Sequence, residues 1–433
     1  MTSVDRRRAW FGWCMYDWAN SAFATVMLAA VLPVYFASLI PSEGATLNLF
    51  GWHRMISATT LWGYAVAGSM LLVAVTAPFL GAIADRNRLR RFLLIFFCLL
   101  GAAATGFLSL TGPGQYLLVA GLFMLANLGF AAGNIFYNAF LPALADGPDL
   151  DRLSARGFAA GYIGGGLMLL IDFILIQGYA SFGLPDKGAA TRLGFLLTGL
   201  WWIGFALPTF RYVREEVFIH TPAPLPPGLR GYIHTFAEIR HYPELFRFLL
   251  AFLFYNDGIQ TIIAVSAIFA REELKLGTGS ILGCFLMIQF VAMPGALLFG
   301  RLARLWGAKR AVMLSLALFL GVACYAYLMQ TAWQFWLLGL VVALILGGSQ
   351  AISRSLFAAL VPVGKTAEFF GFYAISGKFA AILGPLIFAL IGDLTGSSRL
   401  SILALAIFFI IGMLLLAGVD VKRGRDRAKP KTG

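Results

Sequence analysis

Residues 92–112 read FLLIFFCLLGAAATGFLSLTG, a stretch without a single charged side chain. About 20 apolar residues in a helix are enough to cross the hydrocarbon core of a bilayer. The stretch is continuously apolar, whereas a strand of a membrane barrel alternates apolar and polar residues. Because lipid offers no hydrogen-bond partner, each backbone N–H and C=O must be paired within its own segment. Residues 92–112 therefore predict a transmembrane helix.

Eleven further apolar runs of comparable length flank this one, so we expect an all-α membrane protein with twelve transmembrane helices. The first half has runs at 12–39, 58–83, 92–112, 115–142, 157–182 and 191–210, and the second at 246–270, 279–303, 310–330, 332–360, 369–392 and 399–418. The expected organisation is an N-terminal six-helix half (1–210), a cytoplasmic linker (211–245), a C-terminal six-helix half (246–420) and a basic cytoplasmic tail (421–433).

Composition supports lipid rather than water as the solvent. The 433 residues are 60% hydrophobic and 12% charged, whereas soluble domains carry roughly 25% charged residues. Most of the Lys and Arg residues fall in alternate connections, and basic loops stay on the cytoplasmic side. We therefore expect both termini to be cytoplasmic. We also expect the protein to be a monomer and to lie in a bacterial inner membrane. The net charge of +13 is explained by topology and calls for no nucleic-acid partner.

The linker is expected to be interrupted and surface-bound. Four prolines between Pro222 and Pro227 prevent one long helix. After them, the apolar residues Tyr232, Ile233, Phe236 and Ile239 stand against the charged Glu238 and Arg240, which predicts a short amphipathic helix on the cytoplasmic face.

The loop GAIADRNRLRR, Gly81–Arg91, has a counterpart in the second half of the chain. At one fixed spacing, Gly81, Asp85, Arg90 and Arg91 are matched by Gly300, Arg304, Lys309 and Arg310. Parallel repeats of this kind relate the two halves of many carriers. The sequence therefore predicts two pseudo-symmetric six-helix halves.

This loop resembles the major facilitator loop signature of Gly, three residues, Asp-Arg and a basic pair. A glycine permits close helix approach, and a carboxylate can pair with an arginine or with a helix N-terminus. We expect a gating role for the residues Gly81, Asp85, Arg86, Arg90, Arg91, Arg304 and Arg354. The alternative is a basic loop that only fixes topology.

Four longer motifs are more specific. They read YDWANSAF (16–23), FLFYNDGIQT (252–261), GGSQAISRSLFAALVP (347–362) and FFGFYAISGKFAAILGP (369–385). Together they resemble the small major facilitator family that includes the fungal vacuolar amino-acid effluxers linked to autophagy. The resemblance runs over essentially the whole chain and implies the major facilitator fold and export of amino acids.

Four ionisable residues lie inside predicted spans: Asp17, Asp172, Asp257 and Lys378. Each costs about 2.5–3.5 kcal/mol to insert, so such residues usually line an aqueous path. Asp257 is a candidate for a proton or substrate-ammonium site, the alternatives being an ion pair or a helix cap. Lys378 could hold a substrate carboxylate, the alternative being a permanent salt bridge to Asp257. Asp172 lies toward the outer part of its span, where hydration would lower the free-energy cost of its charge.

Uncharged polar residues accompany these charges. Asn20 shares a helix face with Asp17, and Gln260 shares one with Asp257, from the 100° rotation per residue. Candidate solute contacts also include Asn134 and Asn138, on one stripe with Asn127, and the aromatic pair Tyr137 and Tyr255. The alternative for the amides is packing between membrane helices.

These features predict a secondary active transporter that moves a small polar solute by alternating access between two halves. A zwitterion such as a neutral amino acid fits the charge pattern, moving outward with a proton or cation as coupling ion. Two rivals stay open: a cation-coupled sugar or drug carrier of the same fold, and a membrane receptor or scaffold that moves no solute. We expect no cofactor, no metal site and no enzymatic activity, because no nucleophile–base pair or metal-ligand spacing stands out.

Overall fold

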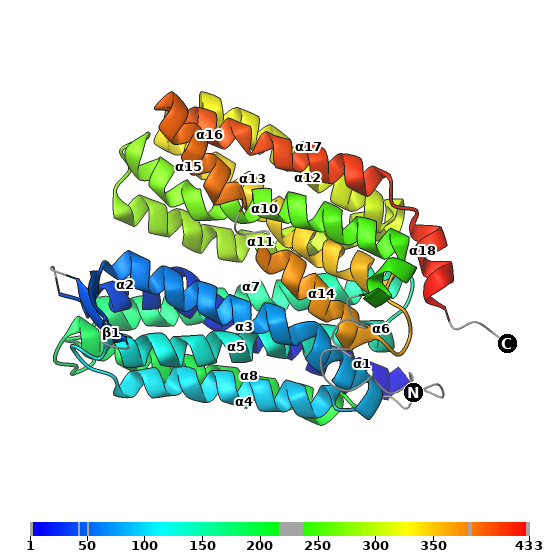
Figure 1. Cartoon of the computed structure of the whole chain (residues 1–433), viewed down its shortest axis with the longest axis horizontal. Coiled ribbons are helices and arrows are strands. Elements are labelled where there is room, and N and C mark those ends of the chain that lie inside the picture. Colours follow the sequence, from blue (N-terminus) through cyan, green and yellow to red (C-terminus); the bar gives the residue numbers. More distant parts are fainter. Residues whose placement is uncertain (1–2, 42–43, 50–51, 216–236, 380–382, 430–433) are drawn as a thin grey trace. The chain divides into compact units, whose positions relative to one another are not determined.

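The computed structural model describes residues 3–41, 44–49, 52–215, 237–379 and 383–429. These residues are helical apart from turns, connections and one antiparallel hairpin, β1 (Ala45–Leu49) and β2 (Trp52–Ile56), in which Ala45 pairs with Ile56 (Figure 1). The hairpin follows the first apolar run and was not anticipated from the sequence.

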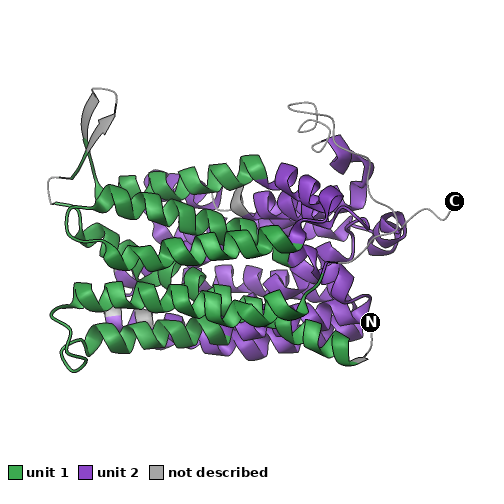
Figure 2. Cartoon of the chain, turned by 90° about the horizontal axis from the view of Figure 1, so that it is seen from below, with its two compact units in different colours: residues 1–76, 91–137, 163–214 green, residues 77–90, 138–162, 215–433 purple. Residues whose placement is uncertain are grey.

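The chain divides into two compact units, coloured separately in Figure 2. Unit 1 comprises Met1–Thr76, Arg91–Tyr137 and Ile163–Arg214, and unit 2 comprises Ala77–Arg90, Asn138–Tyr162 and Glu215–Gly433. Two short segments of the first six runs thus cluster with the later part of the chain. The division into six-helix halves stays a prediction.

The elements of unit 1 include most of the early helices. They are α1 (Ser3–Ala22), the π-helix η1 (Phe23–Ala30), α2 (Leu32–Ser38), α3 (Ala58–Asn87), α4 (Arg90–Phe107), η2 (Leu108–Leu110), α5 (Tyr116–Ala139) and α8 (Lys187–Tyr212). The end of α3, and the first half of α7 (Pro148–Gln177), belong to unit 2.

Unit 2 contains the remaining helices. They are α6 (Leu141–Leu144), η3 (Ile239–His241), α10 (Pro243–Glu272), α11 (Thr278–Trp306), α12 (Ala308–Leu328), α13 (Ala332–Ala358), α14 (Thr366–Phe379), α15 (Leu383–Thr395), α16 (Ser398–Ala404), α17 (Ala406–Ala417) and α18 (Val421–Ala428).

Ten helices of the described chain are long and apolar enough to cross a membrane, and an eleventh span results if α1 with η1 and α2 form one bent segment. The range 369–392, expected as one helix, holds α14 and α15, and residues 380–382 between them lie outside the described part. The count of twelve spans therefore stays a prediction.

The first span also differs from a straight helix. Residues 12–39 pass from α1 through η1, and the axis then turns by 42° at Val31 before α2. Pro33 stands in the first turn of α2, where its missing N–H costs nothing. A single π turn marks functional sites in many helices, and here it occupies eight residues.

The two cytoplasmic segments expected from the sequence are partly described. Most of the expected amphipathic stretch before Ile239 lies outside the described residues, and Ile239 itself begins η3. The basic tail contains α18, which Asp420 caps by accepting a hydrogen bond from the Arg423 N–H at 3.0 Å.

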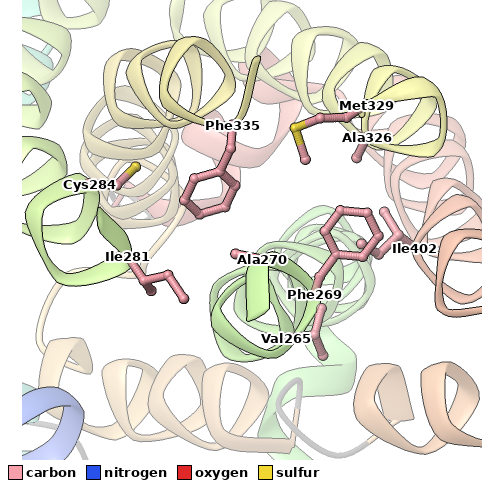
Figure 3. Close-up of a cluster of buried hydrophobic side chains, with 9 residues drawn as sticks. All are labelled: Val265, Phe269, Ala270, Ile281, Cys284, Ala326, Met329, Phe335 and Ile402. Carbon is pink, nitrogen blue, oxygen red and sulfur yellow. The ribbon is translucent and has the colours of Figure 1, made fainter. Parts of the chain in front are cut away.

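Each unit has its own apolar core. In unit 2, Figure 3 shows a buried cluster formed by Val265, Phe269, Ala270, Ile281, Cys284, Ala326, Met329, Phe335 and Ile402. In unit 1, the Tyr137 ring stacks on Trp13 and on Tyr16 at centroid distances of 4.5 and 4.7 Å. Lipid tails are apolar, so the hydrophobic effect does not drive helices together within the bilayer. Dispersion between such large rings stabilises the helix contact instead.

Candidate solute site and latch

Polar groups of unit 1 meet where α1 faces α5. The Asn20 Nδ2 donates a hydrogen bond to Asn134 Oδ1 at 2.8 Å. Tyr137 is fully buried one turn along α5, and its carbonyl accepts from Trp13 Nε1 at 3.1 Å. Asp17, also buried, precedes Asn20 by three residues on the same face of α1. Four candidate residues thus gather along one helix pair.

In unit 2, Asp257 sits at the N-terminus of α15. Its side chain is fully buried, and both carboxylate oxygens lie 3.0 Å from the Gly384 backbone nitrogen, which donates to them. Gly384 is required for this approach, because a Cβ there would lie 1.9 Å from Thr261 Oγ1. A carboxylate at a helix N-terminus is stabilised by the unpaired N–H groups and the helix dipole. The contact corresponds to the helix-capping alternative for Asp257.

The neighbours of Asp257 on α10 make their own contacts. Tyr255 is buried and its hydroxyl lies 2.7 Å from Ser353 Oγ on α13. Gln260 is half-buried. The backbone of Lys378 lies in α14, but its side chain is outside what the structure describes, so its contact with a substrate carboxylate stays a prediction and the salt bridge to Asp257 stays the alternative.

The three asparagines expected on one stripe have three different partners. Asn127 donates to Ser69 Oγ at 2.7 Å, Asn134 accepts from Asn20, and Asn138 accepts from Arg354 Nη1 at 3.3 Å. Asn127 and Asn134 belong to unit 1 and Asn138 to unit 2. Asn138 thus contacts a residue assigned to gating rather than its neighbours on the stripe.

Arg354 is held in a buried pocket of unit 2. Its Nε donates to Ser154 Oγ at 2.9 Å and its Nη2 to the Ser154 carbonyl at 3.0 Å, while the guanidinium covers the Phe158 ring at 4.2 Å. Next to it, Ser355 Oγ donates to Asp151 Oδ1. These bonds tie the end of α13 to the start of α7.

Asp85 forms the centre of a second network at the start of α14. Its Oδ2 accepts from the Glu368 N–H at 2.9 Å and its Oδ1 from the Ala367 N–H at 3.1 Å. Gly81 permits this approach, because a Cβ at that position would lie 2.3 Å from the Ala367 carbonyl oxygen. The end of α3 is thereby fixed against the N-terminus of α14, where a negative charge is favourable.

Arginines complete this network. Arg86 Nη1 lies 3.1 Å from Glu368 Oε2, and Arg90 Nε lies 2.8 Å from Glu215 Oε1 and 3.8 Å from Asp85 Oδ1. Arg90 also donates to Thr366 Oγ1 at 2.9 Å. We call the group of Asp85, Arg86, Arg90, Glu215, Thr366 and Glu368 the latch network.

The two other basic gating candidates lie outside the latch network. Arg91 donates to the Phe210 carbonyl in the last turn of α8, in unit 1. Arg304 is exposed in the last turn of α11. A cation near a helix C-terminus is favourable in both cases.

Sequence reasoning missed the acidic members of these networks. Glu215, Glu368 and Asp151 were not singled out, nor was the ion pair of Lys365 with Glu238. The available signal was position, since Glu368 and Asp151 stand in the first turns of α14 and α7. Tyr242 lies close by, and burial, reinforced by the Glu238 and Glu368 carboxylates, raises the pKa of its phenol. The phenol therefore stays protonated.

The helical architecture with its apolar spans is that of a polytopic membrane protein. The structure is similar to that of FucP, a Major Facilitator Superfamily transporter in the outward conformation, with a TM-score of 0.70 and 13% identity over 96% of this chain and 98% of that one. It is also similar to the human organic anion transporter MFSD10, with a TM-score of 0.71 and 15% identity over 96% and 100% of the two chains.

Residues 5–429 match the family described as "Vacuole effluxer Atg22 like", and the chain belongs to this family. It is 36% identical over 416 residues to the "Uncharacterized MFS-type transporter YxiO" of Bacillus subtilis, covering 96% of this chain and 95% of the relative. It is 25% identical over 477 residues to "Autophagy-related protein 22" of Yarrowia lipolytica, covering 88% and 79%. The family predicted from the motifs is confirmed, and the chain is a multi-pass membrane transporter.

Proposed function

We propose that this protein exports a neutral amino acid across a bacterial inner membrane by alternating access, with twelve spans and both termini in the cytoplasm. The observation that carries the proposal is the match to an effluxer family over residues 5–429. Such a match covers the spans, the loops and the buried polar groups together, so it bears on the mechanism as well as on the fold.

The polar groups support a zwitterionic cargo. A neutral amino acid carries an ammonium and a carboxylate, and it needs partners for both once water is removed. Asp17 with the Asn20–Asn134 pair offers acceptors for an ammonium in unit 1. In our proposal Lys378 receives the carboxylate. A sugar lacks both charges, so it would offer neither an ammonium to Asp17 nor a carboxylate to Lys378.

The latch network supports a cycle with discrete states. Opening it would separate Asp85 from two backbone N–H groups and Arg86 from Glu368, all of them buried. Each charge-assisted bond contributes about 1.5–3 kcal/mol. A cargo shifts such an equilibrium only through a difference in affinity between the states. In our proposal the latch network holds one state and bound solute favours its release.

Counterflow in proteoliposomes tests the proposal. Vesicles loaded with unlabelled leucine should take up external radiolabelled leucine faster than empty vesicles, and alanine or valine should compete while glucose should not. Competition by glucose alone would favour the sugar carrier. The absence of counterflow for every solute of an amino-acid, sugar and nucleoside panel would favour the receptor.

A further inference from the structure

Asp172 is a buried carboxylate that the contacts described so far do not use. It lies in the second half of α7, in unit 1, and its side chain is fully buried. Within the described part of the chain, neither carboxylate oxygen has a hydrogen-bond partner and no ion pair forms with it. Asp257, also fully buried, instead has the Gly384 N–H at both oxygens.

The surroundings of Asp172 are built from small and apolar groups. Gly194 of α8 faces it so closely that a Cβ there would lie 2.5 Å from Asp172 Oδ1. On the same face of α7, two turns earlier, Gly165 contacts Thr25 of η1, and a Cβ there would lie 2.5 Å from Thr25 Oγ1. With a rise of 1.5 Å per residue, Asp172 is level with the end of η1, near the break of the first span at Val31.

Within the described residues, no ionisable side chain of the packed elements is hydrogen-bonded to the Asp172 carboxylate. On α8 the ionisable residue nearest to Gly194 in sequence is Arg192. Its Nη1 lies beside Gly188, 3.6 Å from the position that a Gly188 Cβ would take. On the segment from η1 to α2 it is Tyr35, whose hydroxyl donates to the Thr111 carbonyl at 3.4 Å. Past the end of α7 the next along the chain is Tyr179, in the turn that follows Gln177.

A carboxylate in such a place is costly when ionised. Removal of a charge from water costs several kcal/mol unless a partner replaces the water. Binding a proton removes the charge and leaves a neutral acid. Because α7 packs beside the broken first span, a movement there would change the exposure of this acid to water.

We propose that Asp172 is the proton-binding site of the transport cycle: it is protonated in the state described here and releases its proton to water when the first span moves. One proton enters from water on one side of the membrane, bonds to the carboxylate, and leaves to water on the other side. The coupling half of this inference rests on the proposed transport function, whereas the protonation of Asp172 does not.

Infrared spectroscopy of the purified full-length protein tests protonation without any cargo. At pH 7 the parent protein should show absorption from a protonated carboxyl group that shifts in D₂O. Asp172→Asn should lose the intensity of one such group, and Asp172→Glu should restore it at a shifted frequency. Asp257→Asn is the matched control and should retain it, because an N–H donor stabilises the ionised form there. Equal protonated-carboxyl intensity in the parent and in Asp172→Asn overturns the proposal.

Transport of leucine in proteoliposomes tests coupling. In the parent, a pH gradient should drive accumulation, and Asp172→Asn should reduce accumulation to the level without a gradient while counterflow stays within about twofold. Accumulation by the variant that still follows the gradient overturns the coupling role. If the parent moves no leucine at all, the cargo assigned above is wrong, and the infrared result still decides whether Asp172 binds the proton.

Discussion

The loop from Gly81 to Arg91 and its counterpart from Gly300 to Arg310 share backbone features but differ in the interactions of their charged residues. The spacing that relates Gly81 to Gly300 also relates Arg88 to Gly307, and both of these residues have positive φ, 58° and 89°. Both leading glycines face another helix at close range, Gly81 against Ala367 and Gly300 against Ala155. The repeat therefore preserves the turn and the close approach.

The charges differ four residues after each leading glycine, where one loop has Asp85 and the other has Arg304. Asp85 accepts two backbone N–H groups of α14, whereas Arg304 is exposed at the matching position. One loop thus carries a buried network and the other a basic surface. A repeat can thus retain its backbone geometry while only one copy has the buried interaction that could stabilise one state.

The largest expected effect is that of Asp85→Asn, which removes the negative charge at the α14 N-terminus and beside Arg90. We expect the free energy of unfolding to fall by about 3 kcal/mol, because the buried Arg90 then loses one of its two carboxylates and the Ala367 and Glu368 N–H groups lose their charged acceptor. Thermal unfolding in detergent measures this. Arg304→Gln is the matched change in the other loop and should leave the unfolding temperature as it is. Equal losses for the two variants would mean that the loops do not differ in this way.

A second comparison concerns the two glycines. Gly81→Ala places a Cβ 2.3 Å from a backbone carbonyl oxygen, and Gly300→Ala places one 2.6 Å from the Ala155 Cβ. We expect Gly81→Ala to lower the free energy of unfolding by about 2 kcal/mol. Adding Ala155→Gly should rescue Gly300→Ala, whereas adding Ala367→Gly should not rescue Gly81→Ala, because its obstacle is main chain. Rescue in both cases would contradict the described approach of α3 to α14.

The smallest expected effect is at the shared turn. Arg88 pays the steric cost of positive φ that Gly307 avoids. Arg88→Gly should therefore raise the free energy of unfolding by about 0.5 kcal/mol after the greater chain entropy of glycine is subtracted. Gly307→Ala should lower it. A loss of stability in Arg88→Gly would show that the arginine side chain contributes more than its backbone costs.

Much of the fold could be predicted because lipid restricts the choices. Runs such as 92–112 must be helices, and α4 (Arg90–Phe107) with η2 fills that range. The bend at Val31 was harder to predict, because it depends on tertiary partners as well as on the nearby Pro33. Hydropathy also gave no sign of the hairpin that begins at Ala45.

The candidate site could be predicted only where local sequence determines it. Helix periodicity placed Asn20 near Asp17, but no local pattern shows that Asn134 meets Asn20 across 114 residues of chain. Glu368 of the latch network lies in the first turn of α14, where a carboxylate could equally be a plain helix cap. Asp172 stood out as a charge in a span, but only its lack of a described partner separates it from Asp257.

We propose that the latch network must open during transport, and a reversible cross-link across it tests this opening. Arg86 and Glu368, whose side chains meet at 3.1 Å, are replaced by cysteine in a variant whose native Cys14, Cys98, Cys284 and Cys324 are serine or alanine. A cleavable thiol-reactive linker then joins them in proteoliposomes. We predict that leucine counterflow stops while the link is intact and returns when the link is cleaved. Counterflow at the unlinked rate in fully cross-linked protein would show that transport does not require the latch network to open.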